Sequence, residues 1–193
     1  MLIASSLLII FLVALIAVTV IPMAREKAEA NRFAPSIENP DPSTGIAGVV
    51  SIDYPAGDHV AAPQTVAYDQ SPPFGGPHDQ AWATCTGVVY PSPVRNENAV
   101  HSLEHGAVWV TYDPSQLIAD EVAALESKID KVPYALMSPY PGMDTAISLQ
   151  SWGRQLKLDD VSDERIGQFL TALRQNPNTH PEIGASCSTA PRG

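Results

Sequence analysis

The chain has 193 residues, of which 45% are hydrophobic and 17% are charged, so it can bury one core of ordinary size. Its formal net charge of −10 at pH 7 repels phosphate backbones, and we therefore expect no nucleic-acid partner. Metal cations or basic protein patches suit an acidic surface better, although such a surface often serves only solubility.

The N-terminal segment is apolar and long enough to cross a membrane. A helix from Leu2 to Met23 would span roughly 30 Å at 1.5 Å per residue, which matches a bilayer core. Residues 28–30 have the small-x-small form of a signal-peptide cleavage site, but the apolar run is longer than a signal peptide requires and no basic segment precedes it. We expect a single-pass membrane anchor over residues 1–24, a linker over 25–44 and a folded domain over 45–193.

Two signals disagree about the side of the membrane on which the domain lies. Arg25, Lys27 and Arg32 follow the apolar run, and the positive-inside rule alone would place the domain in the cytoplasm. The two cysteines, Cys85 and Cys187, lie far apart and outside any CxxC pattern, as expected of one disulfide in an oxidising compartment; two unrelated buried thiols are the alternative. A start site upstream of Met1, hiding a basic segment, would reconcile the two signals. We expect an extracytoplasmic domain.

The first half of the domain is expected to contain short strands and stiff loops. A loop rich in proline and glycine, residues 71–78, should be rigid and tightly turned. Short valine-rich runs bounded by Gly, Pro or Asp favour strands. These runs are, in chain order, residues 46–54, 59–68 and 87–90.

The second half alternates helices with strands. This mixed order predicts an α+β fold, with a small mixed sheet and two or three helices following the N-terminal transmembrane helix. The expected elements are a helix at 97–105 that ends at Gly106, a strand at 107–112, a helix from Pro114 to about Lys131, strands at 134–137 and 145–152, and a last helix capped by Ser162.

Four histidines form the most function-like pattern in the chain. His101 and His105 are four residues apart, so on a helix their rings lie on one face and can share a metal ion. His78 ends the stiff loop and His59 follows a turn, and both places can hold a ligand in a fixed position. We predict that His78, His101 and His105 converge on a metal, whereas His180 in the polar tail only packs or caps.

The remaining ligand and the identity of the metal are open. Met137 precedes the turn at residues 138–142, and its thioether would favour copper(I), while imidazole serves copper or zinc. Methionine in a strand is more often core filler. We expect His59 or Met137 to complete the site, with copper as the first choice of metal and zinc as the second.

Residues 101–105 also match H-x-x-E-H, the inverted zinc-peptidase signature. In that hypothesis Glu104 activates a water molecule and Glu182 supplies a third ligand. About 150 folded residues leave little room for a peptidase cleft, and Gly106 ends the helix directly after the motif.

Several short motifs lie along the domain: Tyr68 with residues 72–78, then 87–90, 101–108, 137–141 and 151–154. Their combination resembles a bacterial family known as domain-of-unknown-function family 3105, common in actinobacteria. The resemblance covers roughly residues 45 to 183 and implies one membrane helix preceded by a basic cytoplasmic segment. This chain lacks that basic segment. The resemblance implies no established reaction.

Three hypotheses follow. The leading one is a non-enzymatic metal-binding module of the cell envelope, anchored in the cytoplasmic membrane. The second is a structural or partner-binding envelope protein whose histidines form a hydrogen-bonded core around Glu104. The third is a small zinc hydrolase with Glu104 as its base.

Overall fold

The computed structural model describes residue 28, residues 32–62 and residues 64–188. The predicted anchor at Leu2–Met23 lies outside these residues. Within the described part of the chain, no helix combines the length and the apolar character that a membrane crossing needs.

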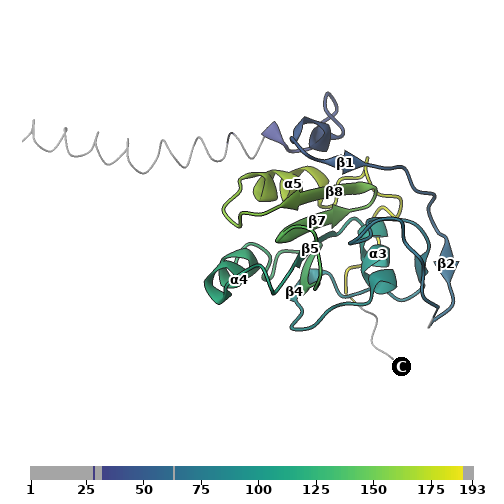
Figure 1. The fold of residues 1–193 in the computed structure, drawn as a ribbon. Coiled ribbons are helices and arrows are strands. Elements are labelled where there is room, and N and C mark those ends of the chain that lie inside the picture. The colour runs from purple at the N-terminus through teal and green to yellow at the C-terminus, as the bar shows by residue number, and fades with distance from the viewer. Residues whose placement is uncertain (1–27, 29–31, 63, 189–193) are drawn as a thin grey trace, which may run out of the picture.

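A six-stranded mixed sheet forms the centre of the domain, and its strands follow the order β1-β8-β7-β5-β6-β4 (Figure 1). β4, β5 and β6 pair in parallel, whereas β1, β8, β7 and β5 pair antiparallel. The bounds are Val50–Ser51 for β1, Thr86–Val89 for β4, Val108–Tyr112 for β5, Ala135–Pro139 for β6, Ile147–Ser151 for β7 and Arg154–Leu158 for β8.

A separate parallel pair, β2 (His59–Val60) and β3 (His78–Asp79), lies outside the main sheet on the side of α3 (Figure 1). Its register places His59 opposite His78. Three α-helices and one short 3-10 helix complete the described residues: η2 (Pro42–Gly45), α3 (Asn96–Glu104), α4 (Ala119–Glu126) and α5 (Arg165–Leu173).

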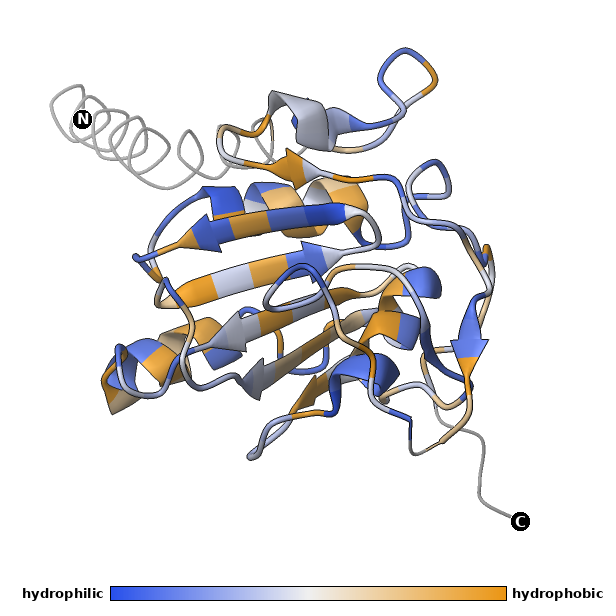
Figure 2. Cartoon of the chain, turned by 45° about the vertical axis from the view of Figure 1, so that its right-hand side comes forward, coloured by the Kyte–Doolittle hydropathy of each residue, from blue (hydrophilic) through white to orange (hydrophobic). Residues whose placement is uncertain are grey.

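The two faces of the sheet differ in what covers them. Successive side chains of a strand point to opposite faces, and β7 and β8 show this as an alternation of hydrophobic with hydrophilic residues (Figure 2). One face, here called the helix face, packs against α4 and α5 through Leu125, Ile166 and Phe169. The other, the loop face, packs against α3, the loops around β2 and β3, and the C-terminal segment.

The fold class is confirmed as α+β with a mixed sheet and three helices. The helix expected at 97–105 is α3, and Gly106 ends it with a φ of +90°, a conformation that glycine adopts without strain. The strand expected at 107–112 is β5.

Several expected boundaries are wrong. The runs at 46–54 and 59–68 contain only the two-residue strands β1 and β2, because backbone groups of this region bond to side chains instead, as the Val66 amide does to Glu97. The helix expected from Pro114 begins at Ala119, because the Asp113 carboxylate holds the preceding residues in a turn.

The last helix and one strand also differ from expectation. α5 has Glu164 and not Ser162 at its N-cap, because Ser162 bonds to Asp160 in a separate turn. β8 was not expected, because only Leu156 and Leu158 are apolar in this segment and Gln155 is buried although it is polar.

Contacts with the domain begin before Gly45, within the segment expected to be a linker. Phe33 is buried in the core, and Asp41 forms an ion pair with Arg154 at 2.9 Å. The Asn176 side chain donates to the Pro40 carbonyl. Part of residues 25–44 therefore packs on the sheet.

The predicted disulfide is confirmed: Cys85 and Cys187 are bonded, 102 residues apart in sequence. The Cys85 amide also donates to the Cys187 carbonyl at 2.9 Å. The C-terminal segment is thereby fixed beside β4 and the end of α3.

Candidate metal centre

Four side chains from three segments meet above the loop face. His59 and His78 face each other across the β2–β3 pair, and α3 supplies His101 and Glu104. The three imidazole rings lie 4.9 to 5.0 Å apart between centroids. One ligand atom from each of the four residues lies within 4.8 Å of the others, and we call this group the inner cluster.

Most of the inner cluster is removed from solvent. The side chains of His78 and Glu104 are 0% exposed, His101 is buried, and His59 alone is exposed. A buried carboxylate is costly unless hydrogen bonds or an opposite charge compensate it. The cluster therefore needs a positive partner for Glu104.

Backbone carbonyls fix the orientation of the two buried rings. His78 Nδ1 lies 2.8 Å from the Gly76 carbonyl, and His101 Nδ1 lies 2.6 Å from the Asp79 carbonyl. A carbonyl oxygen only accepts, so each Nδ1 carries the proton and each neutral ring keeps a lone pair on Nε2. Histidines that bind metals are oriented in this way by their second nitrogen.

Local sequence explains why these carbonyls are in place. Gly76 has a φ of +98°, which lets the proline-rich loop turn its carbonyl back toward His78. The Asp79 carboxylate accepts from the Ala81 amide at 2.9 Å and contacts Arg95, so the backbone that orients His101 is held from both sides.

The contact between His78 and Glu104 is the most informative one in the cluster. His78 Nε2 lies 2.8 Å from Glu104 Oε2, while Oε1 of the same carboxylate accepts from the Gly57 amide at 2.7 Å. Neither Nε2 nor Oε2 has a well-oriented hydrogen bond to any residue that the structure describes. Two lone pairs cannot face each other at this distance without a cation, either a proton or a metal ion.

Burial and neighbouring charges shift the pKa values of these groups. Burial lowers the pKa of His78, but Glu104 and the Gly76 carbonyl raise it by more, so it lies above its usual value. Burial raises the pKa of Glu104, and the contacts with His78 and Gly57 lower it by more. Burial and the adjacent histidines lower the pKa of His101 to about 4, so this ring is neutral at pH 7 and able to bind a metal.

His105 lies next to His101, as the helical spacing predicted, with 4.5 Å between ring centroids. It does not join His78, however. His105 Nε2 lies 3.1 Å from Glu182 Oε2, and ligand atoms of His101, His105 and Glu182 form a second group within 4.8 Å. We call this second group the outer cluster. The prediction that His78, His101 and His105 converge on one point is therefore wrong for His105.

Met137 is not brought to the histidines. It is fully buried on the helix face, packed in the core that contains Val108 and Phe169, whereas α3 lies on the loop face. Strand alternation explains this position, since Leu136 takes the loop face and Met137 the opposite one. The prediction of a thioether ligand from Met137 is wrong.

His180 is more deeply buried than its position in the polar C-terminal tail suggested. Its side chain is buried, and its Nδ1 lies 3.3 Å from the Glu104 carbonyl. A Cβ added at Gly106 would lie 2.7 Å from His180 Nε2, so this ring packs closely against the end of α3. It belongs to neither cluster.

The arrangement gives little support to Glu104 as the base of a hydrolase. A general base needs a carboxylate oxygen that is free to reach a water molecule. Here Oε1 is occupied by the Gly57 amide, Oε2 faces His78, and the side chain is fully buried. Glu104 lies where its carboxylate could hold a metal ion together with the three histidines.

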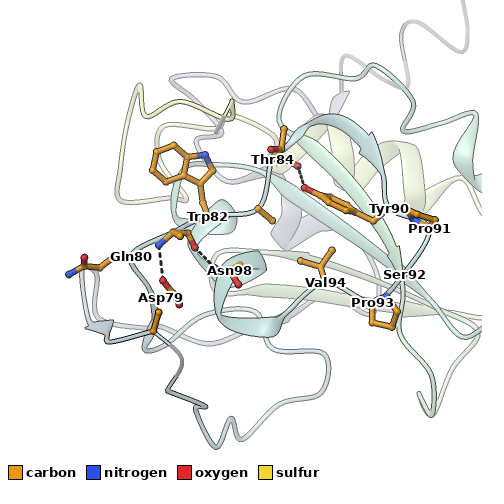
Figure 3. Close-up of a pocket in the computed structure, with 13 residues that line it drawn as sticks. Asp79, Gln80, Trp82, Thr84, Tyr90, Pro91, Ser92, Pro93, Val94 and Asn98 are labelled. Carbon is orange, nitrogen blue, oxygen red and sulfur yellow. Dashed lines mark hydrogen bonds between the residues drawn. The ribbon is translucent and has the colours of Figure 1, made fainter. Parts of the chain in front are cut away.

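A groove lies beside the clusters, and Trp82 is one of the residues that line it (Figure 3). The indole ring is 5.5 Å from His101 and 4.8 Å from His105. Some polar groups in the wall of the groove hydrogen-bond to each other, as the Asn98 side chain does when it donates to the Ala81 carbonyl. None of the clustered histidines lines it. Its apolar wall includes Tyr90, Pro91, Pro93 and Val94.

Comparison with known proteins gives one match. The family model described as "Protein of unknown function (DUF3105)" matches residues 59–189, a segment that contains all members of both clusters. No curated protein and no solved structure matches the chain.

Proposed function

The chain belongs to the DUF3105 family, whose description names no activity, and from its own residues we propose that the inner cluster binds a divalent transition-metal ion. The observation that carries this proposal is the 2.8 Å contact of His78 Nε2 with Glu104 Oε2, two buried atoms that lack a well-oriented hydrogen bond and need a cation to compensate them. A metal ion bound by both side chains would supply the missing positive charge.

The ligand types favour zinc, with copper(II) as the second choice. Imidazole nitrogen suits zinc and copper, zinc also accepts a carboxylate oxygen, and four protein ligands are typical of structural zinc. The position of Met137 removes the soft sulfur ligand on which the expectation of copper(I) rested. We therefore propose metal binding or handling, and not catalysis, as the function.

A purely structural role is the second candidate, and the same contact also supports it. If His78 carries a second proton, it forms a buried ion pair with Glu104, and the histidines serve as a hydrogen-bonded core. Metal content separates the two candidates, because an ion-paired core holds no metal.

The test is metal analysis of the purified full chain after loading with zinc or copper(II) and dialysis. We expect about one equivalent, and we expect His78→Ala and Glu104→Gln to lose most of it. His180→Ala removes a buried histidine outside both clusters and should keep the metal. Less than roughly a tenth of an equivalent in the wild type would leave no useful stabilisation by metal and would refute the proposal.

We also propose that the domain lies outside the cytoplasmic membrane, tethered by Leu2 to Met23. The disulfide between Cys85 and Cys187 supports this location, because such bonds persist in oxidising compartments. Protease added to intact cells should then remove the domain, whereas complete protection until lysis would contradict this location.

A further inference from the structure

The outer cluster repeats the lone-pair arrangement of the inner cluster, closer to solvent. His105 Nδ1 lies 2.8 Å from the Ser186 carbonyl, so it carries the proton and leaves a lone pair on Nε2. That atom faces Glu182 Oε2 at 3.1 Å. The His105 side chain is 3% exposed and that of Glu182 is 41% exposed, so the carboxylate joins a buried ring to the surface.

The C-terminal segment holds the outer cluster in place. The Glu182 amide donates to the Glu104 carbonyl at 3.2 Å, and the Tyr134 hydroxyl donates to the Ala185 carbonyl at 2.7 Å. The next residue but one, Cys187, is bonded to Cys85. The acceptor for His105 and the carboxylate that faces it are thus both built into the fold.

His101 is common to both clusters and can serve only one ion at a time. Its Nδ1 is bonded to the Asp79 carbonyl, which leaves Nε2 as its single free ligand atom. Its ring lies 4.5 Å from His105 on one side and 4.9 Å from His78 on the other. The two clusters are therefore alternative positions joined by one shared ligand.

We propose that the outer cluster is a second, surface-facing position for a divalent transition-metal cation, from which the ion passes to the inner cluster. The transfer is a ligand exchange without change of oxidation state: His105 and Glu182 are released, and His101 stays bound. The other inner-cluster members, which are His59, His78 and Glu104, take their places. This inference rests on the proposed function, because it requires that the inner cluster binds metal.

Charge favours this route over direct loading through His59, which is also exposed. Glu182 offers a solvent-accessible carboxylate, whereas the Glu104 carboxylate is fully buried and His59 is an imidazole. An accessible negative group speeds the capture of a cation. The ion should therefore meet the outer cluster first.

The test is the rate of zinc uptake by the metal-free full chain and of zinc release to a chelator, measured by stopped flow. Glu182→Gln keeps the size of the side chain and should slow uptake by about tenfold or more, while about one equivalent is still bound at equilibrium. His105→Ala should act in the same direction. Glu164→Gln, which removes an exposed carboxylate near α5, is the matched control and should leave the rates unchanged.

A second pair of variants keeps the inference testable if rates are difficult to resolve. His78→Ala should retain weak zinc binding in titrations, through the outer cluster alone, and His78→Ala with Glu182→Gln should abolish it. Unchanged uptake in both outer-cluster variants, or loss of the equilibrium metal in Glu182→Gln, would overturn the passage role. Absence of zinc from the wild type would instead refute the proposed function itself.

Discussion

The two faces of the central sheet are stabilised in different ways. On the helix face, α4 and α5 cover a continuous apolar core, in which Val108, Val110 and Leu149 are fully buried. On the loop face, buried polar groups such as Thr111 and Gln150 lie on strands beneath irregular loops, α3 and the disulfide-linked C-terminal segment.

This difference shows that the loop face contains buried polar groups, which lower stability unless their contacts are well formed. Apolar burial is favourable in proportion to area and needs no particular geometry. Buried histidines and carboxylates stabilise only when each lone pair and proton finds a partner. Besides its own apolar cluster, the loop face therefore depends on specific contacts and a covalent bond, as expected if it holds the proposed metal site.

Removing the disulfide should have the largest effect. The bond closes a loop of 102 residues, for which the chain-entropy model gives about 4 to 5 kcal/mol. The double variant Cys85→Ser, Cys187→Ser should lower the free energy of unfolding in urea by that amount. Dithiothreitol should destabilise the wild type and leave the double variant unchanged. A loss below about 1 kcal/mol would mean that the loop face holds its C-terminal segment without the bond.

A core truncation on the helix face should cost nearly as much but act independently of metal. Phe169→Ala removes a fully buried ring of α5, and such changes cost about 3 to 5 kcal/mol. Ile166→Val, at about 1 kcal/mol, is the milder version if the first variant does not fold. The loss should be equal with and without zinc, and a zinc-dependent loss would show that the two faces are coupled.

The sequence predicted the features that follow from local spacing or from the presence of only two cysteines. The i, i+4 positions of His101 and His105 did place their rings side by side, and the two isolated cysteines did pair. The α+β class followed from the order of strand and helix patterns.

The grouping of the histidines could not be predicted, because it depends on contacts between distant segments. The carbonyls of Asp79 and Ser186 decide how His101 and His105 are oriented, and no pattern in the sequence marks a backbone acceptor. Met137 was misplaced for a related reason: a one-residue change in strand parity decides which face a side chain joins. The sequence indicated Glu182 only as a third ligand in the peptidase hypothesis, because nothing in the sequence shows that it lies beside His105.

Zinc should stabilise the protein through the loop face alone. At a free concentration of one hundred times the dissociation constant, binding to the folded state adds about 2.7 kcal/mol to the free energy of unfolding. His101→Ala should lose this increment, because the shared ligand is missing. Phe169→Ala should retain it in full despite its lower stability. Thermal unfolding of both variants with and without zinc tests this, and a retained increment in His101→Ala would contradict the assignment.

The metal-free protein should lose a smaller amount of stability as the pH falls from 6.5 to 4. His101 has a folded pKa of about 4 against 6.5 unfolded, so the unfolded chain binds more protons in this window. The raised pKa of His78 acts oppositely, because its contribution is complete below pH 6.5 and is lost as the pH rises. His101→Asn can still donate to the Asp79 carbonyl and should flatten the fall measured by urea unfolding. An unchanged slope would contradict a buried neutral His101.

The smallest effect should come from the ion pair that docks the N-terminal segment on the edge of the sheet. Asp41 and Arg154 are 19% and 17% exposed, and Arg154 donates to the carboxylate from Nε at 3.2 Å and from Nη2 at 2.9 Å. Pairs near the surface contribute about 0.2 to 1 kcal/mol, because solvent screens them and ordering both side chains opposes the attraction. Asp41→Asn should therefore lower the free energy of unfolding by no more than about 1 kcal/mol.

The same variant sharpens the contrast between the two faces. Asp41 belongs to neither cluster, so Asp41→Asn should keep the zinc content and the zinc-dependent increment of the wild type. Asn keeps the shape of the side chain and one oxygen that can accept from the Ser43 amide. Its NH2 group replaces Oδ2 and cannot accept from Arg154, so the charge and the two hydrogen bonds of the ion pair are removed together. A loss above about 2 kcal/mol in urea unfolding would exceed what a screened pair supplies. It would mean that the segment before Gly45 is part of the cooperative core, and that the sheet is stabilised at its β1–β8 edge as well as on its two faces.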